Sequence, residues 1–224
     1  NYISPIHTLE VTAVNGNITN VVLGDGTKIS LNGGSKLKYP DTFRGNLREV
    51  SIEGEAFFDV AHDADKPFIV HTGDISTHVL GTSFNIKAYA DEQLLKVDVV
   101  SGKVGIVPSG NVEFKTVFLT PAEGIVYNKD KRTISKSSNV DVDVLTKWKE
   151  GKLVFKKSPL PEVIKTLHRK FNYSIKADDN LSGCFISADF TNVPLKDIMA
   201  VIAKLVKGKA TLTDNGYHLK GKGC

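Results

Sequence analysis

Short runs in which apolar and polar side chains alternate fill the first 140 residues, and this pattern restricts the fold more than any other feature. Alternation with a period of two places successive side chains on opposite faces of a β-strand. Turn-forming pairs such as Asn15-Gly16 and Asp25-Gly26 separate the runs. Residues 1–140 are therefore predicted to form an all-β domain of many short antiparallel strands, either a sandwich or a barrel.

The pattern changes near Asp141, and residues 141–151 are expected to form a short helical linker. Beyond it, strands alternate with amphipathic helices. The segments FKKSPLPEVI and FTNVPLKDIM share Phe, Pro and Leu at an offset of 35 residues. Residues 152–224 are thus predicted to be a small α+β domain, in which a tandem β-α-β repeat shares one sheet and one core. Ser158 is the expected N-cap of the first helix.

Charge is divided unevenly along the chain. Residues 141–224 hold 15 Lys/Arg and 9 Asp/Glu, a net charge of +6, whereas residues 1–140 hold 14 and 16. A basic domain can bind nucleic acid, anionic lipid or an acidic protein, although a solvated lysine-rich surface explains the charge more simply. No apolar run reaches the roughly 18 residues that a membrane helix needs.

The stretch LGTSFN resembles part of the nucleophile elbow of hydrolases, with His78 five residues before Ser83. An elbow requires a glycine two residues after the serine and a helix behind it. Here Asn85 takes that position and the run continues as a strand. We therefore expect Gly81, Thr82 and Ser83 to turn the chain between two strands.

The other candidates for chemistry also have structural interpretations. Gly24, Asp25 and Gly26 lack the spacing of a phosphate loop and the helix that follows one, which favours a hairpin turn. Glu53 and Glu55 are interpreted as solvated residues of an outer strand face, and the six histidines show no metal-binding spacing. The sequence thus predicts no catalytic residue, no cofactor and no metal, and hence no enzyme.

Two cysteines, Cys184 and Cys224, are too few for a disulfide scaffold and form no C-x-x-C zinc motif. Cys184 opens a predicted strand and Cys224 follows the last one. If these strands are neighbours, a disulfide fits, and it would stabilise the fold by about 4 kcal/mol. Free thiols are the alternative.

Three stretches of the first domain together resemble the FecR-type periplasmic domain of transmembrane anti-sigma factors. They contain the motifs L-x-D-G-T, L-N-x-G-S, G-E-A-x-F-x-V, P-F-x-V and L-G-T-x-F, over roughly residues 9–108. Residues from Trp148 onward resemble the C-terminal module of FecR-like proteins of the Bacteroidetes type. That module is similar to the short N-terminal signalling domain of secretins and TonB-dependent receptors.

The resemblance implies a membrane-anchored regulator. Members of this family hold an extracytoplasmic-function sigma factor through a cytoplasmic segment, cross the membrane once, and expose a periplasmic sensor to a TonB-dependent outer-membrane receptor. We therefore expect a periplasmic location, an anchor and a sigma-binding segment upstream of this sequence, and no nucleic-acid partner. The resemblance supplies no catalytic residues.

The C-terminal domain is expected to dock the signalling domain of the receptor. Its exposed edge strands favour pairing by strand addition, and its net charge of +6 favours an acidic partner. The alternative is a ligand- or glycan-binding β domain that makes no receptor contact.

Overall fold

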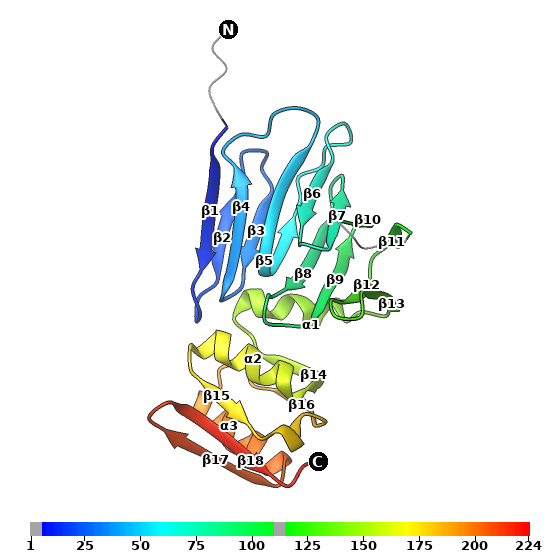
Figure 1. Ribbon diagram of the computed structural model, residues 1–224. Coiled ribbons are helices and arrows are strands. Elements are labelled where there is room, and N and C mark those ends of the chain that lie inside the picture. The colour runs from blue at the N-terminus through cyan, green and yellow to red at the C-terminus, as the bar shows by residue number, and fades with distance from the viewer. Residues whose placement is uncertain (1–5, 110–114) are drawn as a thin grey trace. The chain divides into compact units, whose positions relative to one another are not determined.

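The structure is a computed structural model that describes residues 6–109 and 115–224 (Figure 1). It divides into two compact units. Apart from the short turn Asn15–Asn17, the first unit runs to Thr146, and the second extends from Lys147 to Cys224. Each unit has its own hydrophobic core. Every helix in the described ranges is too short or too polar to cross a membrane.

The first unit is a single curled sheet, followed by a short helix, and the predicted all-β fold is confirmed. The elements are β1 (Thr8–Ala13), β2 (Thr19–Val22), β3 (Lys28–Leu31), β4 (Ser35–Pro40), β5 (Arg48–Asp59), β6 (Phe68–His71), β7 (Ile75–Val79), β8 (Ser83–Ala88), β9 (Leu94–Ser101), β10 (Val104–Pro108), β11 (Val117–Leu119), β12 (Glu123–Asn128), β13 (Thr133–Ser138) and α1 (Val142–Thr146).

The long strand β5 connects the two halves of this sheet. Its first half pairs with β4 and, in parallel, with β6, whereas its second half pairs with β3 and β8. The other strand pairs described in this unit are antiparallel. Gly54 lies where the partners change, with φ of 113°, and a Cβ there would overlap Ser35. Only glycine adopts this conformation without strain, so the residue lets one strand serve both halves.

Inward side chains from both halves form one apolar core. Along β5, Val50 and Ile52 are buried in alternation with exposed residues, whereas Ala56, Phe57 and Phe58 are buried in succession. The ring of Phe58 stacks on that of Phe84, with centroids 5.1 Å apart. Strands such as β3 and β9 bury one face, which explains why alternation in the sequence predicts them well, whereas β6 and β7 bury residues of both faces.

The second unit is the predicted small α+β region, and its two β-α-β units share one core. Its elements are η1 (Lys147–Glu150), β14 (Val154–Pro159), α2 (Leu160–Phe171), β15 (Ile175–Ala177), η2 (Asp179–Leu181), β16 (Phe185–Asp189), α3 (Leu195–Leu205), β17 (Gly208–Thr213) and β18 (Gly216–Gly221).

The prediction that the two β-α-β units share one sheet is wrong. One sheet consists of β14 and β16, and a separate sheet has the order β15-β18-β17. The first strand of each unit therefore enters the small sheet, and the later strands enter the larger one. This interleaving brings α2 and α3 into one core, to which both sheets contribute buried residues.

The prediction that Ser158 caps α2 is also wrong. The strand β14 continues through Pro159, whose φ of −57° and ψ of 137° make it the N-cap residue. Its neighbour Leu160 donates its backbone N–H to the carbonyl of Cys184 at 2.8 Å, which satisfies a helix donor without a side-chain cap. Pro194 precedes α3 in the same conformation, so the sequence repeat is also a repeat of backbone geometry.

Candidate functional site

Gly24, Asp25 and Gly26 lie between β2 and β3, and Asp25 binds a buried arginine. The Asp25 carboxylate accepts hydrogen bonds from the backbone N–H of Thr27 at 3.0 Å and from its hydroxyl at 2.8 Å. Arg48 Nη1 donates to the same carboxylate at 2.8 Å. The motif therefore neutralises an internal charge.

Arg48 is not among the residues predicted from the sequence, although its position in the alternating pattern of β5 indicates that it is buried. It lies in phase with Val50 and Ile52, the inward residues of β5, and its side chain is 2% exposed. Its guanidinium also donates to the carbonyls of Lys66 and Ala61, both at 2.8 Å. A charged residue on the buried phase of a strand indicates a buried ion pair.

The corner at Gly81 and Thr82 holds neighbouring segments together. A Cβ on Gly81 would overlap His62, and the Thr82 hydroxyl donates to the carbonyl of Lys103 at 3.1 Å. Ser83 begins β8, and its hydroxyl donates to Asp59 at 2.8 Å.

The histidine five residues before that serine has another partner. His78 Nε2 lies 2.9 Å from the hydroxyl of Ser76, and Ser83 is hydrogen-bonded to an aspartate instead. The pKa of His78 lies below its usual value. Burial lowers it most, the nearby charge of His71 lowers it further, and Glu49 raises it by less. His78 is thus paired with a residue of its own strand and Ser83 with a residue of the neighbouring strand β5, and these contacts do not assemble a serine–histidine nucleophile.

The interpretation of Glu55 as simply solvated is incomplete. Its carboxylate accepts hydrogen bonds from Asn32 at 2.8 Å and from Asn85 at 3.1 Å. Asn85 faces Asp98 on the next strand. Burial raises the pKa of Asp98 to about 6; Lys96 opposes this shift and Glu55 adds to it.

Within residues 6–109 and 115–224, no group of three or more His, Cys, Asp or Glu is arranged to hold a metal ion.

In the second unit the structure joins Cys184 and Cys224 by a disulfide, with the Cα atoms 5.6 Å apart. Cys184 is buried in the core of this unit, just before β16, and Cys224 follows β18. The bridge ties the end of the chain to the second β-α-β unit.

The edge of β15 is open for pairing. Among the described strands β15 pairs with β18 alone, in parallel. The Tyr217 N–H donates to the carbonyl of Ser174 at 2.9 Å, and the Asp178 N–H donates to the carbonyl of Leu219 at 3.1 Å. Because backbone groups alternate in direction along a strand, those of Ile175 and Ala177 point away from β18.

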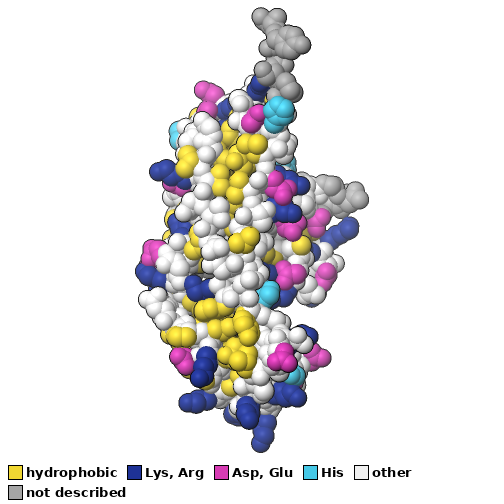
Figure 2. All heavy atoms as spheres, turned by 90° about the vertical axis from the view of Figure 1, so that its left-hand side faces the viewer, with side chains coloured by type: hydrophobic (Ala, Val, Ile, Leu, Met, Phe, Trp, Pro, Cys, Tyr) yellow, Lys and Arg dark blue, Asp and Glu magenta, His cyan; other side chains and the backbone are white. Residues whose placement is uncertain are grey.

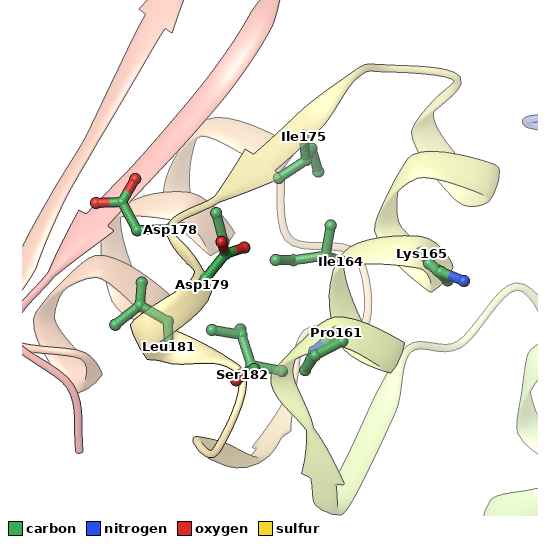
Figure 3. A pocket seen from close by; sticks show the side chains of 10 residues that line it. Pro161, Ile164, Lys165, Ile175, Asp178, Asp179, Leu181 and Ser182 are labelled. Atoms are coloured by element: carbon green, nitrogen blue, oxygen red, sulfur yellow. The ribbon is translucent and has the colours of Figure 1, made fainter. Parts of the chain in front are cut away.

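A groove of about 320 Å³ runs between this edge and α2 (Figure 3). Ile164 extends from α2 across the hollow, toward the segment that contains Asp179 and Leu181. The rim is polar, and Asp178 is held by His218 Nε2 at 2.8 Å. The lining comprises Leu160, Pro161, Ile164, Lys165, Ile175, Ala177, Asp178, Asp179, Leu181 and Ser182. An open strand beside an apolar hollow can bind an extended segment and one of its apolar side chains.

Another edge of this unit is less suited to pairing. The pairing of β14 with β16 is interrupted between Phe155 and Ser158, and Lys157 has a positive φ of 48°. Such irregular edges resist the addition of a further strand. β17 forms the other edge of the larger sheet.

On the face of the second unit seen in Figure 2, apolar side chains gather into a continuous area with lysine and arginine side chains around its lower part.

Comparison with known proteins gives concordant matches over most of the chain. Residues 9–105 match the family described as FecR protein, and residues 152–218 match the family described as FecR, C-terminal. Two crystal structures of a candidate anti-sigma factor from Parabacteroides distasonis are similar, each with 33% sequence identity and a TM-score of 0.88. The alignments cover 96% of this chain and 99% or 100% of that protein. No curated protein matches the chain.

Proposed function

The chain belongs to the FecR family, and from this membership we propose that it is the periplasmic sensor of an anti-sigma factor that relays a signal from a TonB-dependent outer-membrane receptor to an extracytoplasmic-function sigma factor. The relay acts by protein–protein contact and requires no catalysis. The sigma factor is bound by a cytoplasmic segment that is not among these residues, and a membrane anchor connects that segment to the sensor.

The open edge of β15 carries this proposal, because it offers a place where a receptor domain can dock. The outward N–H and C=O groups of Ile175 and Ala177 are available to a partner strand. Ile164 and Leu181 give that strand an apolar hollow in which to bury a side chain. Backbone pairing supplies affinity and the hollow supplies selectivity.

The charge of the C-terminal part of the chain sets the chemistry of the partner. Residues 141–224 carry a net charge of +6, so an acidic signalling domain would be attracted before contact is made. Such steering mainly raises the association rate and weakens as salt screens the charges. We therefore propose an acidic receptor domain with a free, extended strand.

A titration of the 224-residue chain with the signalling domain of a TonB-dependent receptor encoded beside it tests the proposal. Ile164→Lys places a charge in the groove and is expected to weaken binding at least about tenfold, since an ion buried without a partner is costly. Val201→Lys on α3 is the matched control, because Val201 is 41% exposed and lies outside the groove lining. This control is expected to bind as the parent chain does.

Deletion of residues 141–224 gives a second readout. The proposal requires receptor binding to be lost when this segment is removed. If the shortened chain still binds the receptor domain, docking at β15 is contradicted. Equal effects of Ile164→Lys and Val201→Lys on binding, in chains that remain folded, would also contradict it.

A further inference from the structure

A second hollow lies on the first unit, outside the docking site proposed above. Its floor crosses the outward face of three strands, where His78 on β7 faces Gly105 on β10, and Gly105 faces Phe118 on β11. Gly105 has no side chain, and it lines a cavity together with the histidine and the phenyl ring. The cavity measures about 550 Å³, within the roughly 300–1,000 Å³ of small-molecule sites.

The walls of this hollow are mainly apolar. Leu80 is 43% exposed and Phe118 is 57% exposed, and Pro67, Val79 and Val107 add to the apolar lining. Large apolar side chains left in water beside a concave surface are typical of binding sites. Gly81 and Thr82 also line the hollow.

The ionisable residues of the hollow are all basic. Lys103 lies over the ring of Phe118, with Nζ 4.7 Å from the centroid, and it also lines the hollow. His62 and His78 are the other ionisable lining residues, and none of the lining residues in the described ranges carries a carboxylate. An apolar hollow with a lysine at its rim complements a ligand that has an apolar body and one negative charge.

The geometry favours a small molecule over a bound peptide strand. β11 is an edge strand, and a peptide would have to pair with it to lie along the hollow. However, Lys136 Nζ donates to the carbonyl of Phe118 at 3.1 Å. Lysines at sheet edges discourage further strand pairing, because they occupy the groups that a new strand would need.

We propose that this hollow binds a small amphipathic carboxylate, with its apolar tail over Gly105 and beside Leu80, and its carboxylate next to Lys103. The site belongs to the first unit, so the inference does not depend on receptor docking at β15. It gives the β domain a sensing function of its own for an acyl-type ligand.

Decanoate, with decanol as its uncharged counterpart, tests this inference by calorimetric titration of the 224-residue chain. Decanoate is expected to bind saturably, with amide shifts at Gly81 and Gly105 in NMR spectra. Lys103→Gln should weaken decanoate about fivefold, in line with one partly exposed charge pair, and leave decanol unchanged. Lys28→Gln, an exposed lysine on β3, is the matched control and should leave both affinities unchanged.

Gly105→Val tests the apolar part of the site. A Cβ on Gly105 would meet Phe118 at 3.4 Å, so the added side chain fills the hollow and both ligands should be lost. Leu80→Ser, on the exposed corner, serves the same purpose if Gly105→Val does not fold. The inference is overturned if decanoate does not bind saturably, if Lys28→Gln acts as strongly as Lys103→Gln, or if only acidic peptides bind.

Discussion

At the scale of single residues, the ion pair between Arg48 and Asp25 joins a turn to a strand residue 23 positions away in the sequence. The arginine has no access to water, and its charge is balanced by one carboxylate and by backbone carbonyls. A buried pair of this kind contributes little net stability when intact, but its loss leaves an uncompensated internal charge. The Asp25-Gly26-Thr27 turn is thereby coupled to the core.

Asp25→Ala is therefore expected to lower the free energy of unfolding by about 3–5 kcal/mol. Urea unfolding followed by circular dichroism measures the loss. Asp65→Ala, at an exposed aspartate of the β5–β6 loop, is the control and should change stability by less than about 0.5 kcal/mol. A loss below about 1 kcal/mol for Asp25→Ala would show that Arg48 finds another counter-charge.

Asp98 predicts a dependence of stability on pH. Its pKa is raised by burial from 3.8 to about 6, so the folded state binds this proton more tightly than the unfolded chain does. The resulting stabilisation is complete below about pH 4 and is lost as the pH rises through about 6. Two pKa units correspond to about 3 kcal/mol.

Asp98→Asn removes the ionisable group and keeps its shape. The variant should be more stable than the parent chain at pH 7.5, by up to about 3 kcal/mol, and should lose that advantage at pH 4. Urea unfolding at the two pH values measures the difference. A stability difference that does not change with pH would mean that Asp98 ionises normally.

At the scale of elements, the corner between β7 and β8 depends on glycine and little on the serine that follows it. Gly81→Val would push a side chain into His62 and should destabilise the first unit by several kcal/mol, about 3 or more. Ser83→Ala removes one exposed hydrogen bond to Asp59 and should cost less than about 1 kcal/mol. Thermal unfolding compares the two variants. Equal losses of stability would contradict the view that the corner depends on Gly81 more than on Ser83.

The disulfide is the main covalent constraint on the second unit. Cys184 and Cys224 lie 40 residues apart in sequence, and the closed loop should contribute about 4 kcal/mol in the chain-entropy account. Cys224→Ser is expected to lower the unfolding temperature of this unit and leave the first unit unchanged. Calorimetry on both chains checks this, and free thiols at both positions in the parent chain would rule out the bridge.

Strand positions could be predicted from the sequence because most strands bury one face and show it as alternation. The pairing of β5 with both halves of the sheet could not be predicted, because pairing partners are set by contacts far apart in sequence. The β-α-β repeat likewise predicts the helices and one core, but it contains no signal for which strands pair. The hollow at Gly105 is lined by residues spread from His62 to Phe118, so local sequence patterns could not predict it either.

At the scale of the whole molecule, the two units differ in core, charge and available surfaces. The first unit belongs to the acidic part of the chain, and it carries the hollow proposed for a small carboxylate. The second lies in the basic part, and it presents the open strand β15 and its groove. This division fits a sensor in which one unit binds a ligand and the other contacts a protein.

The most direct test of receptor docking is amide hydrogen exchange of the 224-residue chain, followed by NMR, with and without the acidic signalling domain of the receptor. Strand addition at β15 predicts that the amides of Ile175 and Ala177 exchange more slowly in the complex, because their N–H groups become hydrogen-bonded. Protection confined to β17 or to the first unit, with unchanged exchange at Ile175 and Ala177, would contradict the account.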